Sequence, residues 1–172
     1  MAPRRFSDQN CSIARTLAVV GERWTLLVVR ELILGRTRFS EIRENVGVST
    51  NVLADRLDAL VEEGIATKTR VAARGQVHDY RLTAKGYDLG PVLIALTAWG
   101  DAHAPGELGP PRSWWHLDCD HETSPELTCS HCHQRLSPGS VRAIPGPGAD
   151  ERQRAEGMLP AAPGATASTP PS

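Results

Sequence analysis

The order of elements between residues 36 and 82 constrains the fold of this chain more than any other feature. Apolar spacing and turn residues in this stretch predict two helices and then two strands, over 40–45, 50–63, 65–71 and 77–82. Gly47 supplies the turn between the helices, and Ser49 is a residue type that can cap the second helix. A helix-turn-helix followed at once by a hairpin is a winged helix, so we expect a mainly α-helical fold with a small β wing.

Three further helices are predicted around this motif, over 12–20, 23–34 and 84–103. The helix over 23–34 is apolar on most of its sides, which is typical of a buried central helix. The helix over 84–103 carries an apolar stripe at helical spacing, formed by Leu89, Val92, Leu93, Leu96 and Trp99. Residues 11–104 are therefore expected to form one domain, preceded by a flexible N-terminus at 1–10.

A winged helix can insert the N-terminal end of its second helix into the major groove of DNA, whose width admits one helix. Polar or basic side chains occupy the positions that would approach a duplex, namely Ser49, Thr50, Asn51 and Arg56 on the second helix, Lys68, Arg70 and Arg74 on the hairpin, and Arg36 and Arg38 before the first helix. Ser49 also fits a cap alone, and Arg74 also fits a solvated turn residue. Arg56 also fits an ion pair with Glu63 or Asp55.

Charge is divided unevenly along the chain, although the net charge is only −1. Residues 1–86 contain 14 Lys and Arg against 10 Asp and Glu, whereas residues 87–172 contain 5 against 10. A basic front half suits a surface that faces phosphate. Within the second helix of the motif, the acidic side chains of Asp55, Asp58 and Glu62 are expected to limit groove entry to its first two turns.

The chain has no apolar stretch close to the roughly 20 residues needed to span a bilayer. Its N-terminus lacks the uninterrupted apolar run of a signal peptide, because Arg15 breaks the run over 13–20. We therefore expect a cytoplasmic protein whose partner is double-stranded DNA and not a membrane. In that compartment the four cysteines are expected to be thiols or metal ligands and not disulfide halves.

Residues 11–32 resemble the opening of HxlR-type regulators, winged-helix relatives of the MarR proteins. The shared pattern is a cysteine, a short helix ending at a glycine turn, a basic residue and a tryptophan, here Cys11, Gly21, Arg23 and Trp24. Residues 38–70 are similar to the helix-turn-helix of that family, and 80–100 to its second wing strand and last helix. The resemblance covers about half of the chain. It departs in the wing, because 72–80 lack the proline that members commonly carry near the hairpin turn.

The resemblance implies a homodimer that binds inverted-repeat operators and dimerises through its first and last helices. This agrees with the length of the apolar stripe over 84–103, which so small a domain can hardly bury alone. The expected function is a transcriptional repressor released by thiol modification or by a small effector. In some members a cysteine at the position of Cys11 senses quinones, aldehydes or oxidants, and a helix N-terminus favours the thiolate. The alternative is a small packed residue in the dimer interface.

A Cys/His-rich module is predicted at 112–143. Cys129 and Cys132 have the spacing of a zinc knuckle, and His116 and Cys119, ten residues upstream, repeat it. The two pairs together would give a tetrahedral structural zinc site, which can supply the folding energy that so small a segment lacks. His121 is the next choice as fourth ligand. A reversible disulfide between the two cysteines of the knuckle, or free thiols without a role, are the alternatives.

Residues 145–172 consist mainly of Pro, Gly, Ala, Ser and Thr and are expected to form a disordered tail. The sequence contains no Gly-rich phosphate loop, no Ser/His/Asp set and no paired carboxylates in a plausible cleft, so we expect no enzyme. The competing function is a protein-interaction adaptor that uses the winged helix and the Cys/His module without binding DNA.

Overall fold

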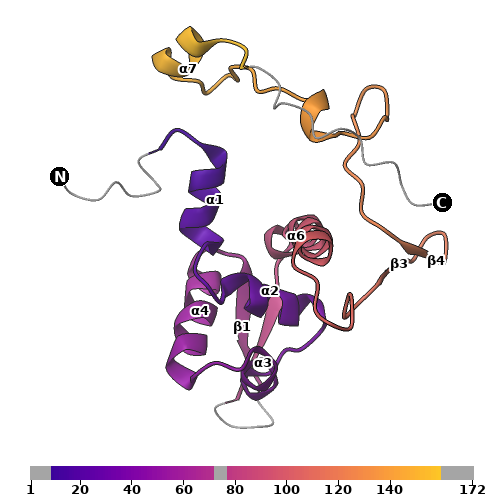
Figure 1. The fold of residues 1–172 in the computed structure, drawn as a ribbon. Coiled ribbons are helices and arrows are strands. Elements are labelled where there is room, and N and C mark those ends of the chain that lie inside the picture. The colour runs from indigo at the N-terminus through magenta and orange to yellow at the C-terminus, as the bar shows by residue number, and fades with distance from the viewer. Residues whose placement is uncertain (1–8, 72–76, 160–172) are drawn as a thin grey trace. The chain divides into compact units, whose positions relative to one another are not determined.

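The computed structural model describes residues 9–71 and 77–159, which divide into two units, 1–111 and 112–172 (Figure 1). The first unit consists of α1 (Ser12–Val20), α2 (Thr25–Ile33), α3 (Phe39–Val46), α4 (Thr50–Glu62), β1 (Ala66–Arg70), β2 (His78–Leu82), α5 (Ala84–Tyr87) and α6 (Gly90–His103). The second consists of β3 (Trp114–His116), β4 (His121–Thr123), the 3-10 helix η3 (Pro138–Ser140) and α7 (Glu151–Glu156). None of the helices in these described ranges is long and apolar enough to cross a membrane.

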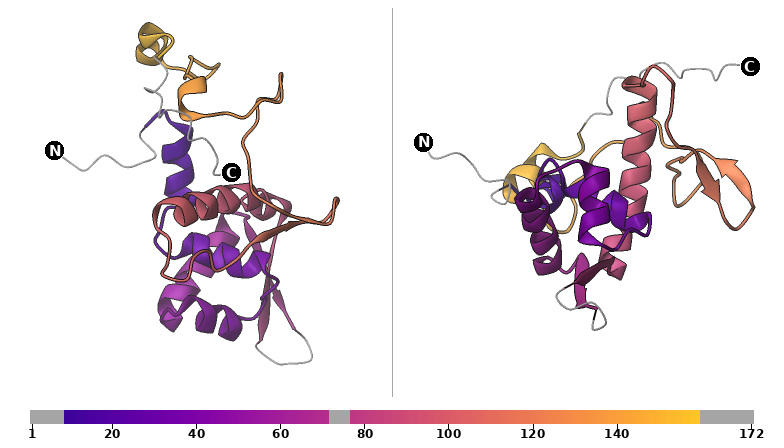
Figure 2. Two further views of the ribbon diagram at one scale, coloured as in Figure 1. Left: turned by 45° about the vertical axis from the view of Figure 1, so that its right-hand side comes forward. Right: turned by 90° about the horizontal axis from the view of Figure 1, so that it is seen from below.

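Helix α2 is the centre of the first unit, as its apolar sequence predicts. It packs against α3, α4, β2 and α6, and Figures 1 and 2 show it between α3 and α6. The fully buried side chains come from α2, α3 and α4, among them Val28, Val29, Ile42, Leu53 and Leu57. The helix α1 contributes little to this core. It stands apart from the other helices of the unit (Figures 1 and 2), and Ile13 and Leu17 on it are exposed.

The wing is an antiparallel hairpin of β1 and β2, with Ala66 opposite Leu82 and Arg70 opposite His78. The segment before α3 joins its edge, because the Tyr80 amide donates a 2.8 Å hydrogen bond to the Thr37 carbonyl. These bonds fix the base of the wing to the start of α3. The winged helix-turn-helix expected from the sequence is therefore confirmed, although residues 72–76 of the wing loop, including Arg74, lie outside the described residues.

The helix predicted over 84–103 is in fact two helices, α5 and α6. Pro91 lies in the first turn of α6 and has no backbone N–H. It cannot bond to the carbonyl of residue 87, so a continuous helix would lose a hydrogen bond at this point. The spacing of apolar residues did not predict this interruption, because the apolar stripe over 84–103 continues on both sides of Pro91.

The predicted disordered tail also differs in part from the structure. Residues 151–156 form α7, and the carboxylate of Asp150 accepts a 2.8 Å hydrogen bond from the Gln153 amide as its cap. The cap at Asp150 thus stabilises the start of α7, a helix that the composition of the tail did not predict. Residues 160–172 of the tail and 1–8 of the predicted flexible N-terminus lie outside the described residues.

Gly86 in α5 is buried against the residue that precedes β1. A Cβ atom at this position would lie 2.2 Å from the Ile65 carbonyl oxygen. We expect Gly86→Ala to lower the free energy of unfolding by about 1–3 kcal/mol, the usual cost of overpacking. Urea unfolding at fixed protein concentration measures this. Gly90→Ala is the matched control, because a Cβ there meets no atom within 4 Å. Equal midpoints for the two variants would contradict the prediction.

Candidate DNA-binding surface

The turn between α3 and α4 is built by Gly47 and Ser49. Gly47 has φ 73°, in the left-handed region that favours glycine, and its amide donates to the Arg43 carbonyl at the end of α3. Ser49 then starts α4, because its hydroxyl accepts a hydrogen bond from the Val52 amide at 3.4 Å. The cap predicted for Ser49 is confirmed. The two helices leave this turn with the first turn of α4 exposed to solvent.

The exposed first turn of α4 is polar and is braced by α3. Arg43 Nη1 donates a 3.1 Å hydrogen bond to the Thr50 hydroxyl, and both side chains are exposed. Asn51 is exposed beside Thr50. Arg43 was not among the residues predicted from the sequence. Its position in the last turn of the first helix, seven residues before Thr50, was the available signal.

Arg56 and Arg36, both candidates for phosphate contacts, are engaged in ion pairs elsewhere. Arg56 Nη1 lies 3.5 Å from Glu22 Oε2, in the segment between α1 and α2. The sequence had suggested Glu63 or Asp55 as the partner of Arg56, and both suggestions are wrong. Arg36 Nη1 lies 2.8 Å from Glu31 Oε2. These contacts link Arg56 of α4 to the segment between α1 and α2, and Arg36 to the end of α2.

Glu31 is a buried carboxylate on the otherwise apolar helix α2. Its side chain is 2% exposed, and its two oxygens lie 2.7 Å from Arg30 and 2.8 Å from Arg36. Glu31 was not predicted as a buried carboxylate, because one acidic residue in an apolar helix gives no periodic signal. The only indication in the sequence that Glu31 has cationic partners was the presence of Arg30 directly before it and of Arg36 after the end of α2.

Arg38 and Lys68 occupy the base of the wing. Arg38 is half-buried, pairs with Asp79 of β2 through the backbone, and its amide donates to the Glu41 carboxylate that follows in α3. Lys68 donates a 3.1 Å hydrogen bond to Asp58 of α4. That bond, together with the neighbouring Tyr80 ring, raises the pKa of Lys68 above its usual value. Part of the acidic surface of α4 is thus neutralised by the wing.

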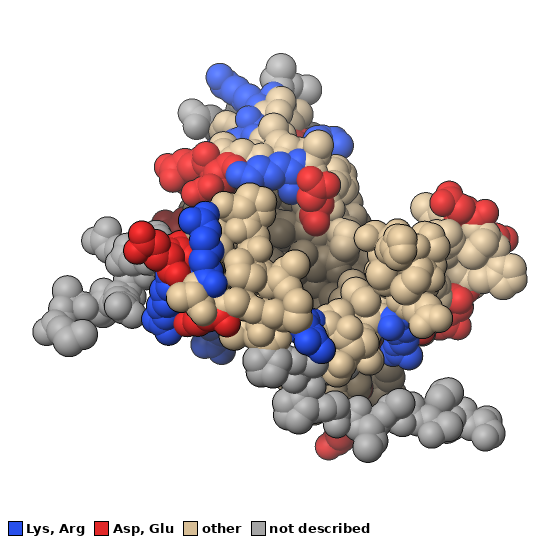
Figure 3. Space-filling model, turned by 90° about the horizontal axis from the view of Figure 1, so that it is seen from above, with Lys and Arg blue, Asp and Glu red and all other residues tan. Residues whose placement is uncertain are grey.

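The other members of the predicted set that the structure describes are exposed. Arg70 is exposed at the end of β1, next to the wing loop. Asp55, Asp58 and Glu62 are exposed along α4, as expected for positions that limit contact with phosphate. Figure 3, a view from above, shows Lys and Arg side chains interspersed with Asp and Glu side chains and with uncharged residues.

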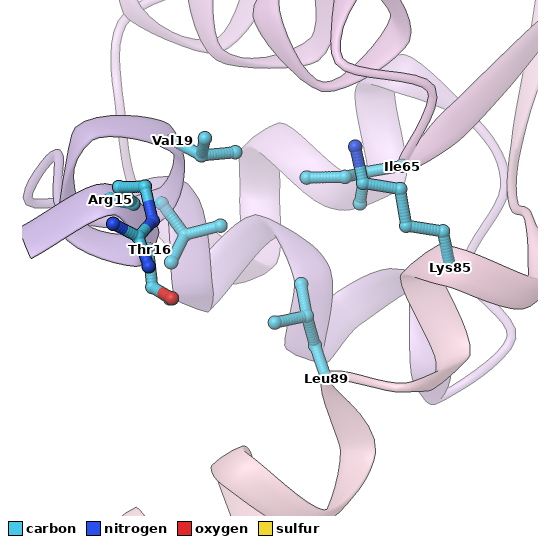
Figure 4. A pocket seen from close by; sticks show the side chains of 7 residues that line it. Arg15, Thr16, Val19, Ile65, Lys85 and Leu89 are labelled. Carbon is cyan, nitrogen blue, oxygen red and sulfur yellow. The ribbon is translucent and has the colours of Figure 1, made fainter. Parts of the chain in front are cut away.

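A cavity of about 290 Å³ opens between α1, α5 and the start of β1. Figure 4 shows Arg15, Thr16 and Val19 on one side of the space and Ile65, Lys85 and Leu89 on the other. Its lining is mostly apolar, with the two cations at its edge. Cys11 lies at the N-terminal end of α1, half-buried and with a free thiol, as the residue before the first helical turn.

In the second unit the predicted metal ligands come together as two pairs. His116 Nδ1 lies 3.0 Å from Cys119 Sγ. The amides of Cys132 and of His131, and then the Cys132 side chain, hydrogen-bond to the Cys129 sulfur and lower the pKa of its thiol. Over 9–71 and 77–159, however, the structure brings no three His, Cys, Asp or Glu side chains close enough to hold a metal ion.

A helix-turn-helix with an exposed polar first turn on its second helix, followed by a wing, defines a DNA-binding regulator of the winged-helix class. The chain belongs to the HxlR-like helix-turn-helix family, whose pattern matches residues 19–107. The resemblance inferred from the sequence is thereby confirmed.

Individual relatives agree with this assignment. The chain is 39% identical to Rv3095 of Mycobacterium tuberculosis, an uncharacterized HTH-type transcriptional regulator, over 84% of this chain and 90% of the relative. The crystal structure of PA1607, a candidate transcription factor, superposes with a TM-score of 0.71 at 29% identity, covering 81% of this chain and 98% of the other. The redox regulator HypR, in its oxidized form, superposes with a TM-score of 0.52 at 26% identity, covering 56% of this chain and all of the other.

Proposed function

We propose that this chain is a homodimeric, sequence-specific repressor that binds an inverted-repeat operator in the cytoplasm with the first turn of α4. The observation that carries the proposal is the exposed set of Thr50 and Asn51, held by the hydrogen bond from Arg43 and by the cap at Ser49. Hydroxyl and amide groups fixed at a helix N-terminus suit hydrogen bonding to base edges and to phosphate. Arg70, exposed at the end of β1, is the wing cation expected to contact the neighbouring DNA backbone.

A titration of DNA binding against salt tests this function. The fragments are the region upstream of the chain's own gene and those recovered by genome-wide mapping of its binding. A repressor of this kind binds one of these fragments specifically at nanomolar concentration, with log affinity falling linearly as log salt rises. Equal affinity for every fragment and for random duplex would contradict sequence-specific reading. It would favour instead the adaptor that contacts other proteins through the winged helix and the Cys/His module.

Dimerisation through α1 and α6 is supported by their exposed apolar side chains. None of the 14 residues of α6 is buried, although it carries Leu96 and Trp99, which are 49% and 63% exposed. On α1, Ile13 is 71% exposed. A second copy of the chain would cover both helices in a two-fold arrangement, and large exposed apolar patches of this kind mark protein interfaces.

Leu96→Asp tests the proposed interface. We expect this variant to sediment as a monomer where the wild-type chain sediments as a dimer, because a buried carboxylate without a partner is costly. Its affinity for an inverted-repeat operator should fall at least about tenfold, since a monomer has one DNA-binding domain and can contact only one half-site. Leu108→Asp is the matched control, as Leu108 is fully exposed in the segment after α6. If Leu96→Asp still sediments as a dimer, the dimer interface does not include this face of α6.

Release from DNA is proposed to occur through Cys11. A quinone adds to the thiol, so that an S–C bond forms and the thiol proton passes to the quinone oxygen, without any other oxidant. The adduct would enlarge the start of α1, next to the proposed dimer interface. HypR, a redox regulator, shares this fold. A small effector in the cavity beside α1 is the second route, and would leave a Cys11 variant responsive.

We expect benzoquinone to lower the operator affinity of the wild-type chain at least about tenfold and to leave Cys11→Ser unchanged. Thiolate attack requires the sulfur, and serine retains the size and the position before α1. Fluorescence anisotropy with labelled operator measures the affinity, and mass spectrometry locates the adduct. Untreated Cys11→Ser is the control and should bind the operator as the untreated wild-type chain does. Loss of binding in treated Cys11→Ser would assign the response to another cysteine.

A further inference from the structure

The segment from 114 to 136 contains two hairpins that repeat one another residue by residue. In the first, β3 and β4 pair His116 with His121 across a four-residue turn. In the second, the Cys129 amide donates 2.8 Å to the Gln134 carbonyl across a turn of the same length. The bridge between Thr128 and Arg135 corresponds to the pairing of residues 115 and 122.

The two turns also share their internal geometry. The Asp120 amide donates to the His116 carbonyl at 2.9 Å, and the His133 amide donates to the Cys129 carbonyl at 2.8 Å. Asp120 and His133 follow the second candidate ligand of each pair, and they are the two non-glycine residues with positive φ in the described chain, at 56° and 59°. A left-handed residue at this place bends the backbone around the side chains that precede it. Each turn thus presents two potential ligands, three residues apart, from the same corner.

The repeat distinguishes His116 from His121 as the fourth ligand. His116 occupies the place of Cys129, whereas His121 occupies the place of Gln134, which is not a zinc ligand. The Nδ1 atom of His116 faces the Cys119 sulfur at 3.0 Å. Its Nε2 atom lies 3.8 Å from the Asp118 carboxylate. A carboxylate behind the second ring nitrogen is the usual support of a metal-binding histidine.

The described part of the second unit lacks a buried apolar core. Among residues 112–159 whose side chains the structure describes, none is buried. Leu117, in the first turn, and Leu127, before the second turn, are 86% and 70% exposed. A unit without a buried apolar core requires another stabilising interaction, and a structural metal ion is the usual one in segments of this size.

We infer that the two turns are the halves of one structural zinc site, with His116, Cys119, Cys129 and Cys132 as its four ligands. Three thiols lose their protons to solvent when the ion binds, which gives a site of three thiolates and one imidazole. In a tetrahedral site the nitrogen and sulfur ligand atoms lie about 3.6 Å apart, so the His116–Cys119 pair needs to open by only a few tenths of an ångström. Binding draws the second hairpin onto the first. The site is independent of DNA recognition by α4.

Native mass spectrometry of the full chain, purified with zinc, tests the site. We expect one zinc ion per chain in the wild type and none in Cys119→Ser or Cys129→Ser. Cys11→Ser and His121→Gln are the controls and should keep the ion, whereas His116→Gln should lose it. Zinc retained in Cys119→Ser, or lost in His121→Gln, would overturn the assignment of the four ligands. Absence of zinc from the wild type would overturn the site, as would a Cys129–Cys132 disulfide in its place.

Cobalt replacement gives a measurement that does not depend on whether a variant folds. The wild-type chain loaded with Co²⁺ should show the d–d bands of tetrahedral cobalt and the charge-transfer absorption of three thiolates. An octahedral spectrum without thiolate absorption would contradict the proposal.

Discussion

Replacing Arg30 and Arg36 together by methionine should lower the free energy of unfolding by about 3–5 kcal/mol. The two arginines neutralise Glu31, whose side chain is only 2% exposed, and the double variant leaves this carboxylate buried without a cation. Removing the carboxylate as well should restore most of the stability, because an apolar group of similar size is tolerated at a buried site of this kind. The triple variant with Glu31→Leu is therefore expected to unfold close to the wild-type midpoint in urea.

Arg81→Met is the control for the loss of a cation, since Arg81 is largely exposed on β2 and its nearest carboxylate is 3.9 Å away. It should change the unfolding free energy by less than about 0.5 kcal/mol. The triple variant also decides the role of Arg36. If it folds and binds operator with the wild-type salt dependence, Arg36 is a structural residue and not a phosphate contact. A triple variant no more stable than the double variant would show that Glu31 is not the reason for the loss.

The elements of the DNA-binding domain were predictable because each depends on local signals. Gly47 and Ser49 determine the turn and the start of α4 through their own backbone and side chain. The apolar spacing of Leu53, Leu57 and Leu60 identifies the buried face of the same helix, and all three are buried. A wing of two short strands follows from alternation and turn residues. The sequence therefore predicted those elements whose signals come from residues about one helical turn apart along the chain.

The missed features are ion pairs, whose partners the periodicity of apolar residues does not identify. Glu31 is paired with Arg36, five positions later and beyond the end of α2. Arg56 is paired with Glu22, which lies 34 positions earlier in the chain, so this partner depends on tertiary packing. Consequently, three of the cations proposed as phosphate contacts, Arg36, Arg56 and Lys68, are engaged by carboxylates of the domain itself. The interruption at Pro91 was a local signal that the continuing apolar stripe concealed.

These engagements concentrate base recognition on very few side chains. Ser49 caps α4 and Thr50 is bonded to Arg43, so substitution of either also disturbs the motif. Asn51 is exposed in the first turn of α4, and an asparagine amide can contact the edge of an adenine with two hydrogen bonds. Substitution of Asn51 therefore tests base recognition in the operator with the least effect on folding.

Asn51→Ala should weaken operator binding by about 10- to 100-fold, because a two-bond contact to a base edge contributes about 1–3 kcal/mol of discrimination. Binding to random duplex and the slope of log affinity against log salt should stay as in the wild type, since no phosphate contact is lost. Anisotropy titrations of both duplexes at several salt concentrations measure this. Glu62→Gln, three turns further along the exposed side of α4, is the control and should not weaken binding. An equal loss on both duplexes would make Asn51 a phosphate contact, and no loss on either would remove the first turn of α4 from the interface.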